Sequence, residues 1–484
     1  MPSSVPRYGL RLGQRRLNSW SEERLKHPAA RDLTDTNPSH HGLTAPEVGQ
    51  CLARAARQPV YEPDPRGPLQ ARQALADRFG SSPERYWLTA STSEAYAWLF
   101  QVLTLPGDVV ALPQPGYPLL EPLAALAGLK TRDYWFHYLP VDGWVMDQST
   151  LAEAAGCVPL ADQPGEVSEA DLARRRTLEV ASGRVVRRAE GAQVGAARRR
   201  AEGAQAAPAR WLAQVGDAGP APAKAIVAVN PGNPTGVYCP PGPLQRAAAS
   251  TGAALIVDEV FWPFSLEEEP DVEADHFDWP GADGRRTDAA EGGESRSDGQ
   301  SGPVDSRKAV GSGGRGGRAS HLAGGEVLSA RLDGLSKRLA APGVKLAWIR
   351  LDGPDHLVEE AAVALDRVAD TYLSVGAAPA GALPELLELE NATVERIWRR
   401  TMTNLERLRS IWPGRTRRQQ AGWVAVIDAP NGEADLALRL LRDHQLAVHP
   451  GWFYNIPGER ALVVSLLPEP SRFASNLAAL SAAV

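Results

Sequence analysis

The chain has 484 residues and a formal net charge of -6, and 43% of its residues are hydrophobic. This length accommodates two domains or one large domain with a smaller one, and the acidic balance gives no reason to expect a nucleic acid as partner. No run of 18 apolar residues appears, so we expect no membrane span, and the N-terminus lacks the apolar region of a secretion signal. The three cysteines, Cys51, Cys157 and Cys239, lie far apart, which predicts a cytoplasmic protein without disulfides or a metal centre.

Two segments differ in composition from the rest of the chain. Residues 156–222 are rich in Ala, Arg, Gly and Glu and contain RRAEGAQ twice, at 187–193 and 199–205. Residues 266–325 are dense in charge, Gly and Ser and poor in aliphatic side chains, so they cannot form a packed core. We predict that both segments are insertions on the surface.

Outside these insertions, short apolar runs alternate with helical patterns up to about residue 351. The expected strands lie at 84–90, 108–114, 223–230, 253–260, 326–336 and 345–351, and helical patterns lie at 93–103, 121–129 and 244–251. Apolar runs of this length, separated by helices, are typical of parallel strands that are buried on both faces. The sequence therefore predicts an α/β fold, with a mostly parallel sheet covered by helices on both faces, over residues 46–351.

The pattern changes after residue 352. Two long helical patterns (356–374 and 392–410) precede an apolar run at 422–429, a helix at 434–445 and a second apolar run at 461–467. We predict a smaller α+β domain over residues 352–484. Residues 1–45 form an N-terminal segment, and whether its Asn37-Pro38 closes over a substrate is left open.

Polar residues follow the expected strands, at the edge where α/β sheets bind ligands. They are Ser91-Thr92-Ser93, Gln114-Pro115-Gly116-Tyr117, NPGNPTG at 230–236, Asp258-Glu259 and Ser336-Lys337. In this order they resemble the class I/II aminotransferases, which are fold-type I enzymes that use pyridoxal 5'-phosphate. NPGNPTG is the most specific motif, and VDEV and GLSK downstream strengthen it. The resemblance covers essentially the whole chain outside the insertions.

The resemblance implies three catalytic residues. Lys337 would form a Schiff base with the cofactor aldehyde and then move the substrate proton, which requires a primary amine that a guanidinium cannot replace. Asp258 would pair with the pyridine nitrogen and make the ring an electron sink. Asn233 would hydrogen-bond the phenolic oxygen from a turn that is fixed by flanking prolines.

Further residues are implied in binding the cofactor phosphate. Ser91, Thr92 and Ser93 open a helix, where backbone N–H groups and hydroxyls form an anion site, and Ser336 adds a hydroxyl. The ligand-free alternative is that these hydroxyls only cap the helix.

Two tyrosines complete the implied site. Tyr117 matches the aromatic residue that stacks on the cofactor ring, although a core tyrosine is the alternative. Tyr61 resembles the tyrosine that reaches the phosphate from the partner subunit, which implies a homodimer.

Three positions depart from the family pattern. Phe261 stands where many members have a tyrosine that bonds the phenolic oxygen, and Lys345 stands where an arginine usually holds the phosphate. Only six of the 52 basic residues are lysines, so drift would have favoured arginine, and we expect Lys345 to fit a differently shaped phosphate site. Val463 occupies the position of the arginine that clamps the substrate carboxylate, and Arg460 would point to the opposite face of that strand. Another residue binds the carboxylate, the substrate lacks one there, or the alignment shifts by a few residues.

The resemblance therefore predicts an aminotransferase that moves an amino group between an amino acid and a 2-oxo acid. Other pyridoxal phosphate chemistry on the same scaffold, such as a lyase or decarboxylase, is the alternative, because the fold does not determine the reaction. A degenerate cofactor-binding protein is disfavoured by the joint presence of Lys337, Asp258 and Asn233.

Overall fold

The computed structural model describes residues 18–57, 63–157, 221–266, 326–429, 435–458 and 460–484. The two predicted insertions fall almost entirely outside the described residues, and Tyr61 lies outside them as well. Among the residues that are described, no helix combines the length and the apolar composition needed to cross a membrane.

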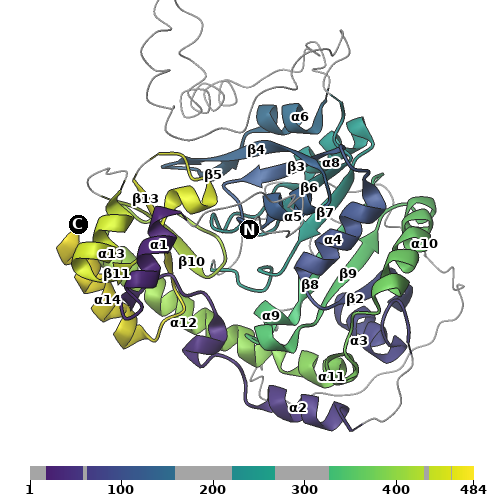
Figure 1. The fold of residues 1–484 in the computed structure, drawn as a ribbon, viewed down its shortest axis with the longest axis horizontal. Coiled ribbons are helices and arrows are strands. Elements are labelled where there is room, and N and C mark those ends of the chain that lie inside the picture. The colour runs from purple at the N-terminus through teal and green to yellow at the C-terminus, as the bar shows by residue number, and fades with distance from the viewer. Residues whose placement is uncertain (1–17, 58–62, 158–220, 267–325, 430–434, 459) are drawn as a thin grey trace, which may run out of the picture.

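A mixed sheet of eight strands forms the centre of the described structure (Figure 1). Its spatial order is β2 (Tyr86–Thr89), β9 (Ala347–Asp352), β8 (Ser329–Gly334), β7 (Ala254–Asp258), β6 (Ala225–Val229), β3 (Val109–Gln114), β4 (Lys130–Leu139) and β5 (Gly143–Met146). Strands β8, β7, β6, β3 and β4 run parallel, whereas β9 is antiparallel to both β8 and β2, and β5 is antiparallel to β4. The predicted α/β fold with a mostly parallel sheet is confirmed.

Helices cover both faces of this sheet because the central strands carry apolar side chains on both sides. In β3, Val109 and Ala111 join the core under α6 (Gln148–Ala155) and α8 (Pro241–Thr251). Val110 and Leu112 point the other way, into the core under α4 (Thr92–Leu103), α5 (Leu120–Leu126) and α10 (Asp355–Tyr372). This alternation is the period of two that a strand imposes on its side chains.

Further helices pack around the β2–β9 edge and the end of β8. Helices α2 (Glu47–Ala55), α3 (Leu69–Phe79) and α11 (Ala377–Glu388) share one core with this edge, and the 3-10 turn η2 (Pro83–Arg85) leads into β2. The short helix α9 (Leu335–Arg338) follows β8 directly, and the 3-10 turn η5 (Pro342–Val344) leads on to β9. The segment that carries Ser336 and Lys337 thus begins where β8 leaves the sheet.

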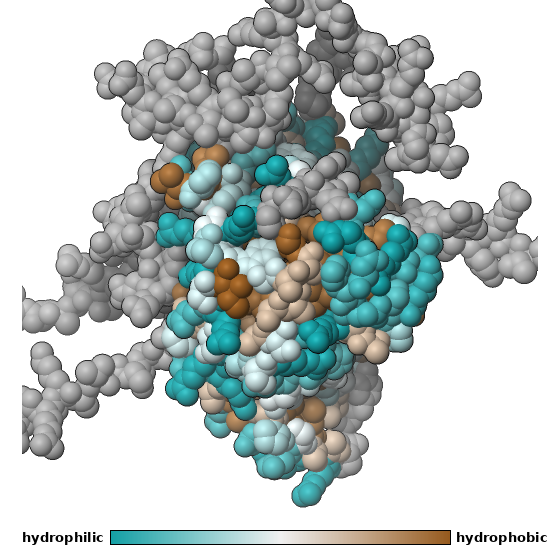
Figure 2. Space-filling model, turned by 90° about the vertical axis from the view of Figure 1, so that its left-hand side faces the viewer, coloured by the Kyte–Doolittle hydropathy of each residue, from teal (hydrophilic) through white to brown (hydrophobic). Residues whose placement is uncertain are grey.

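The C-terminal elements form a second, smaller sheet with its own helices. Strands β10 (Val424–Asp428), β13 (Ala461–Ser465) and β12 (His449–Pro450) are antiparallel, and α12 (Glu390–Ile411), α13 (Leu436–His444) and α14 (Pro470–Ala483) pack against them, while η6 (Gly451–Tyr454) follows β12. Figure 2 shows this side of the molecule, where hydrophilic residues cover most of the described surface and brown residues form only separate patches. The apolar side chains of these elements are mainly inside.

The N-terminal residues pack with the C-terminal ones. Helix α1 (Ser19–Lys26) lies against α13, as the purple and yellow-green ribbons show in Figure 1, and β1 (Arg31–Asp32) pairs in parallel with β11 (Leu446–Ala447). The 3-10 turn η1 (Pro38–His41) follows, and the Asn37 side chain caps it by accepting from the Ser39 N–H. The N-terminal segment is therefore part of the C-terminal core.

Candidate functional site

The parallel strands β8, β7, β6 and β3 are neighbours in the sheet, so their carboxyl ends lie at one edge. Lys337, Asp258, Asn233 and Tyr117 follow these four strands in that order. The residues that the sequence singled out at strand ends thus lie along one edge of the same sheet.

Asp258 is the last residue of β7, and its carboxylate is buried. The Tyr96 hydroxyl donates to Oδ2 at 3.2 Å, and the Val260 N–H donates to Oδ1 at 3.2 Å. Burial raises the pKa of this carboxyl to about 7, although these two donors and the nearby Lys337 act in the opposite direction. A buried carboxylate of this kind is suited to pairing with a cationic ring N–H.

Lys337 lies on α9, just beyond the end of β8. Its Nζ lies 5.4 Å from the ring centroid of Phe261 and 5.1 Å from that of Trp423, and it has no hydrogen-bond acceptor among the described residues. Burial lowers the pKa of this amine. A lowered pKa increases the neutral, nucleophilic fraction that attack on an aldehyde requires.

The residue next to Lys337 anchors α9. The buried Arg338 guanidinium donates from Nε to Asp333 Oδ2 at 2.6 Å and pairs with the Glu390 carboxylate of α12. Because both partners are buried, this network holds α9 between β8 and α12.

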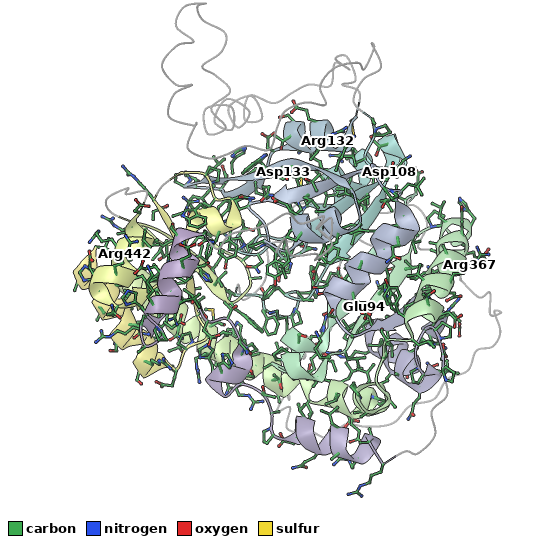
Figure 3. All side chains as sticks on the ribbon, in the orientation of Figure 1. Glu94, Asp108, Arg132, Asp133, Arg367 and Arg442 are labelled. Carbon is green, nitrogen blue, oxygen red and sulfur yellow. The ribbon has the colours of Figure 1, made fainter. Side chains whose placement is uncertain are left out.

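The start of α4 is a variant of the capping box, because Glu94 binds the N–H of the residue before the N-cap Ser91. The Ser91 Oγ accepts from the Glu94 N–H at 3.2 Å, and the Glu94 carboxylate accepts from the Ala90 N–H at 2.7 Å. Figure 3 shows Glu94 at the inner end of α4, whereas Arg367 and Arg442 lie at the rim of the molecule. Ser91 therefore caps the helix, and Glu94 brings a negative charge to a helix end where an anion was expected.

The other predicted hydroxyls keep their hydrogen-bonding capacity. Thr92 and Ser93 on the first turn of α4, and Ser336 on α9, are partly exposed, and their side chains have no hydrogen-bond partner within the described part of the chain.

The two asparagines of NPGNPTG have different environments. Asn230 is buried, and its Oδ1 accepts from the Cys239 N–H at 2.9 Å, which is a structural role. Asn233 is partly exposed, and its amide has no partner among the described residues. Gly236 closes the turn with φ +65°, and a Cβ there would lie 2.3 Å from the Ala421 carbonyl oxygen, so the motif requires glycine at this position.

Tyr117 lies beyond β3, and its side chain is 44% exposed. The preceding residue, Gly116, donates its N–H to the Tyr454 carbonyl at 3.1 Å, so this loop is tied to η6 of the C-terminal part. The Tyr454 hydroxyl lies 3.3 Å from Nδ1 of His449. Burial lowers the pKa of His449 to about 4, so this imidazole is neutral at physiological pH.

The structure also shows the surroundings of Lys345 and Val463, which depart from the family pattern. Lys345 follows η5 in the left-handed region with φ 56°, is exposed, and has no acidic partner among the described residues. Val463 is buried in β13 opposite Val426 and His449, and Arg460 is exposed before that strand. Strand β13 therefore presents no cation at this position.

The residues present fit pyridoxal 5'-phosphate. Lys337 offers an amine, Asp258 a buried carboxylate, and Asn233 an amide, and the amine and the amide have no hydrogen-bond partner among the described residues. Hydroxyls on α4 and α9 suit a phosphate. Two less favourable features are the Glu94 carboxylate and the single amine of Lys345.

Two residues at this site, Tyr96 and Trp423, were not predicted from the sequence. Tyr96 reaches Asp258 from the second turn of α4, four residues after Thr92, and reads in the sequence as an ordinary apolar helix position. Trp423 lies far along the chain, immediately before β10, and only the folding of the C-terminal part brings its ring to Lys337.

Comparisons with known proteins identify the same pattern. A family model described as "Aminotransferase class I and II" matches residues 37–162 and 184–466, which is most of the chain. The chain is 32% identical over 120 residues to nicotianamine aminotransferase 1 of Oryza sativa subsp. japonica. It is 34% identical over 102 residues to the S-alkyl-thiohydroximate lyase SUR1 of Arabidopsis thaliana. These stretches cover 23% and 20% of this chain and only 24% and 21% of the two relatives.

Solved structures match over nearly the full length. An aminotransferase from Escherichia coli superposes with a TM-score of 0.66 over 99% of this chain and 98% of its own, at 15% identity. At this identity the likeness shows a shared fold.

Proposed function

The chain belongs to the aminotransferase class I and II family, whose members depend on pyridoxal 5'-phosphate, and from this premise we propose that it transfers an amino group between an amino acid and a 2-oxo acid. The observation that carries the proposal is the half-buried amine of Lys337, with its lowered pKa, near the buried carboxylate of Asp258 at the carboxyl edge of the sheet.

Each residue has a role that follows from its chemistry. When bound, the cofactor would withdraw electrons from the substrate Cα. We assign to Lys337 the attachment of the cofactor aldehyde and the movement of the proton from the substrate Cα. Asp258 would hold the ring nitrogen in its protonated form, and Asn233 would donate to the phenolic oxygen.

The phosphate would bind at the other end of the site. Its ligands would be the N-terminus of α4 with Thr92 and Ser93, the Ser336 hydroxyl, and Lys345. The Ser91 hydroxyl, which accepts the Glu94 N–H as a helix cap, keeps its own proton to donate to the phosphate, and Tyr117 would stack on the ring.

The substrate class follows from the residues around Lys337. Phe261 and Trp423 lie against this amine and pack with Phe264 and Leu467. Because β13 presents Val463 and no cation, we propose that the amino donor has an apolar or aromatic side chain and that its carboxylate is not held from β13. Assembly as a homodimer, with Tyr61 reaching the partner's site, and a cytoplasmic location are part of the same proposal.

The test is to add pyridoxal 5'-phosphate and single amino acids to the purified protein. We expect visible absorbance from bound cofactor, its loss with one group of amino donors, and its return when a 2-oxo acid is added. Lys337→Ala should abolish both changes, whereas Lys130→Ala, at an exposed position on β4, should leave them intact. Absence of cofactor binding in the unaltered protein would refute the proposal.

A lyase is the second candidate, because the lyase SUR1 is among the matches and Val463 leaves the carboxylate without its usual partner. The same assay separates the two reactions. A β-eliminating lyase would release the substituent of the substrate Cβ, and with water also ammonia and a 2-oxo acid, in every turnover without an added acceptor, whereas a transaminase stops after one turnover until a 2-oxo acid is supplied.

A further inference from the structure

The hydrogen bond between Tyr96 and Asp258 joins helix α4 to the end of β7. Tyr96 is 3% exposed, and its hydroxyl donates to Asp258 Oδ2 at 3.2 Å. We propose that Tyr96 is a positioning residue that keeps the Asp258 carboxylate ionised and oriented toward the cofactor ring nitrogen. This inference rests on the proposed function, because it assigns the ring nitrogen as the partner of Asp258.

Few groups besides Tyr96 could orient the Asp258 carboxylate. Within the described residues Asp258 has two hydrogen-bond donors, one for each oxygen, and the second is the backbone N–H of Val260. A backbone donor two residues along fixes one oxygen through the local turn. The Tyr96 hydroxyl comes from a different element and is therefore the side chain that determines how the other oxygen is oriented.

The charges around Asp258 show why a donor is needed. Asp333 on β8 opposes ionisation of Asp258, Lys337 on α9 supports it, and the Tyr117 phenol beyond β3 also faces this carboxylate. Burial opposes ionisation most strongly and raises the pKa of Asp258 to about 7. Burial also raises the pKa of Tyr96 well above its usual value, so the phenol stays protonated and remains a donor at neutral pH.

Removing the hydroxyl should therefore move the titration of Asp258 in a defined direction. Hydrogen bonds to a charged group stabilise the charged form, so Tyr96→Phe should raise the pKa of Asp258 by about one pH unit or more. Tyr134→Phe is a matched control, because Tyr134 is also buried but donates to the Val227 carbonyl at 2.8 Å and not to Asp258.

The first experiment follows the infrared C=O band of the protonated carboxyl in the cofactor-free, full-length protein. Asp258→Asn identifies the band, which is absent in that variant. We expect its midpoint to rise by about one pH unit in Tyr96→Phe and to stay unchanged in Tyr134→Phe. An unchanged midpoint in Tyr96→Phe, or an equal shift in both variants, would overturn the inference.

The second experiment measures the affinity for pyridoxal 5'-phosphate against pH. Because binding requires ionised Asp258, the pH at which affinity falls off should move upward in Tyr96→Phe. If Tyr96→Phe does not fold, 3-fluorotyrosine at position 96, a stronger donor of nearly the same size, should move both midpoints downward, and no shift there would count against the inference.

Different results would refute the proposed function and the role of Tyr96. If the unaltered protein binds no cofactor, the proposed function fails. If it binds cofactor with the same pH dependence in both Tyr96 variants, only the role of Tyr96 fails.

Discussion

Burial shifts the pKa values of the two central residues of the site, Asp258 and Lys337, in opposite directions. Desolvation favours the neutral form of each, so it raises the pKa of Asp258 and lowers that of Lys337. The electrostatic attraction between them acts against both shifts. The site therefore holds an acid and a base that both ionise more readily when a partner of opposite charge is bound.

The raised pKa of Asp258 has a consequence for stability in the cofactor-free protein. The folded state keeps a proton that the unfolded chain releases between about pH 4 and 7, so this residue makes folding less favourable as pH rises through that window. In Asp258→Asn this contribution is absent. We expect the free energy of unfolding of Asp258→Asn, relative to the unaltered protein, to increase by up to about 4 kcal/mol across the window. Denaturant unfolding at several pH values measures it, and a constant difference would contradict it.

A hydroxyl added at Phe261 tests the position that we assign to the phenolic oxygen of the cofactor. The Phe261 ring lies beside Lys337, and Phe261→Tyr would add a hydroxyl near the place assigned to the phenolic oxygen. One added hydrogen bond should strengthen cofactor binding about tenfold. Phe264→Tyr is the control, because this buried ring packs in the same cluster and should lose stability without gaining affinity. Weaker or unchanged binding in Phe261→Tyr would place the phenolic oxygen elsewhere.

At the scale of elements, buried ion pairs hold the strands and helices that carry the site. Arg331 on β8 donates to both oxygens of Glu259, from Nε at 2.7 Å and from Nη2 at 2.8 Å. Glu259 directly follows Asp258, so this bidentate pair ties the end of β7 to the neighbouring strand. The Arg338 network holds α9 in the same way.

Arg331→Met should be strongly destabilising because it leaves Glu259 charged, buried and unpaired. The expected loss is about 3–5 kcal/mol in the free energy of unfolding. The double variant Arg331→Met with Glu259→Gln should recover much of this loss, since no uncompensated charge is then buried. Equal stability of the single and double variants, measured in urea, would show that the pair contributes through packing alone.

At the scale of the whole molecule, the two ends of the chain share one core. Leu33 from the N-terminal segment is fully buried among Leu440, Leu446, Val464 and Phe473 of the C-terminal part. The next residues continue toward the site, where the Thr44 hydroxyl donates to the carbonyl of Ala340, three residues after Lys337. The N-terminal segment thus connects the C-terminal core to α9.

Leu33→Ala should therefore destabilise the C-terminal part, although Leu33 lies more than 400 residues away from Leu440 and Phe473 in sequence. Loss of a buried leucine costs about 2–5 kcal/mol. Leu25→Ala is the control on the same segment, because Leu25 is 71% exposed and should change stability by no more than about 0.5 kcal/mol. Similar unfolding curves for both variants would mean that the segment packs independently.

The pattern of the sequence predicted the strands that form continuous apolar runs and left out those that are very short or partly exposed. Strand β6 and strand β7 are buried throughout, so a continuous apolar run identified them. Strand β4 has exposed Lys130, Thr131 and Asp133 in its first half and forms a hairpin with the edge strand β5, so it contains no such run. Helices α2, α3, α11 and α14 were not predicted either, because a helical period within a mixed composition is a weaker local signal.

The sequence by itself determined the order of the parallel strands' polar ends, the family, and the functional groups that Lys337, Asp258 and Asn233 offer at those ends. These follow from residue type and from spacing along the chain, which are local properties. Only the tertiary structure decided that Tyr96 donates to Asp258, that Trp423 lies against Lys337, that the Ser91 hydroxyl accepts from the Glu94 N–H, and that Val463 leaves β13 without a cation. Each of these depends on which side chains meet across distant segments and on how deeply they are buried, and burial is a property of the packed whole.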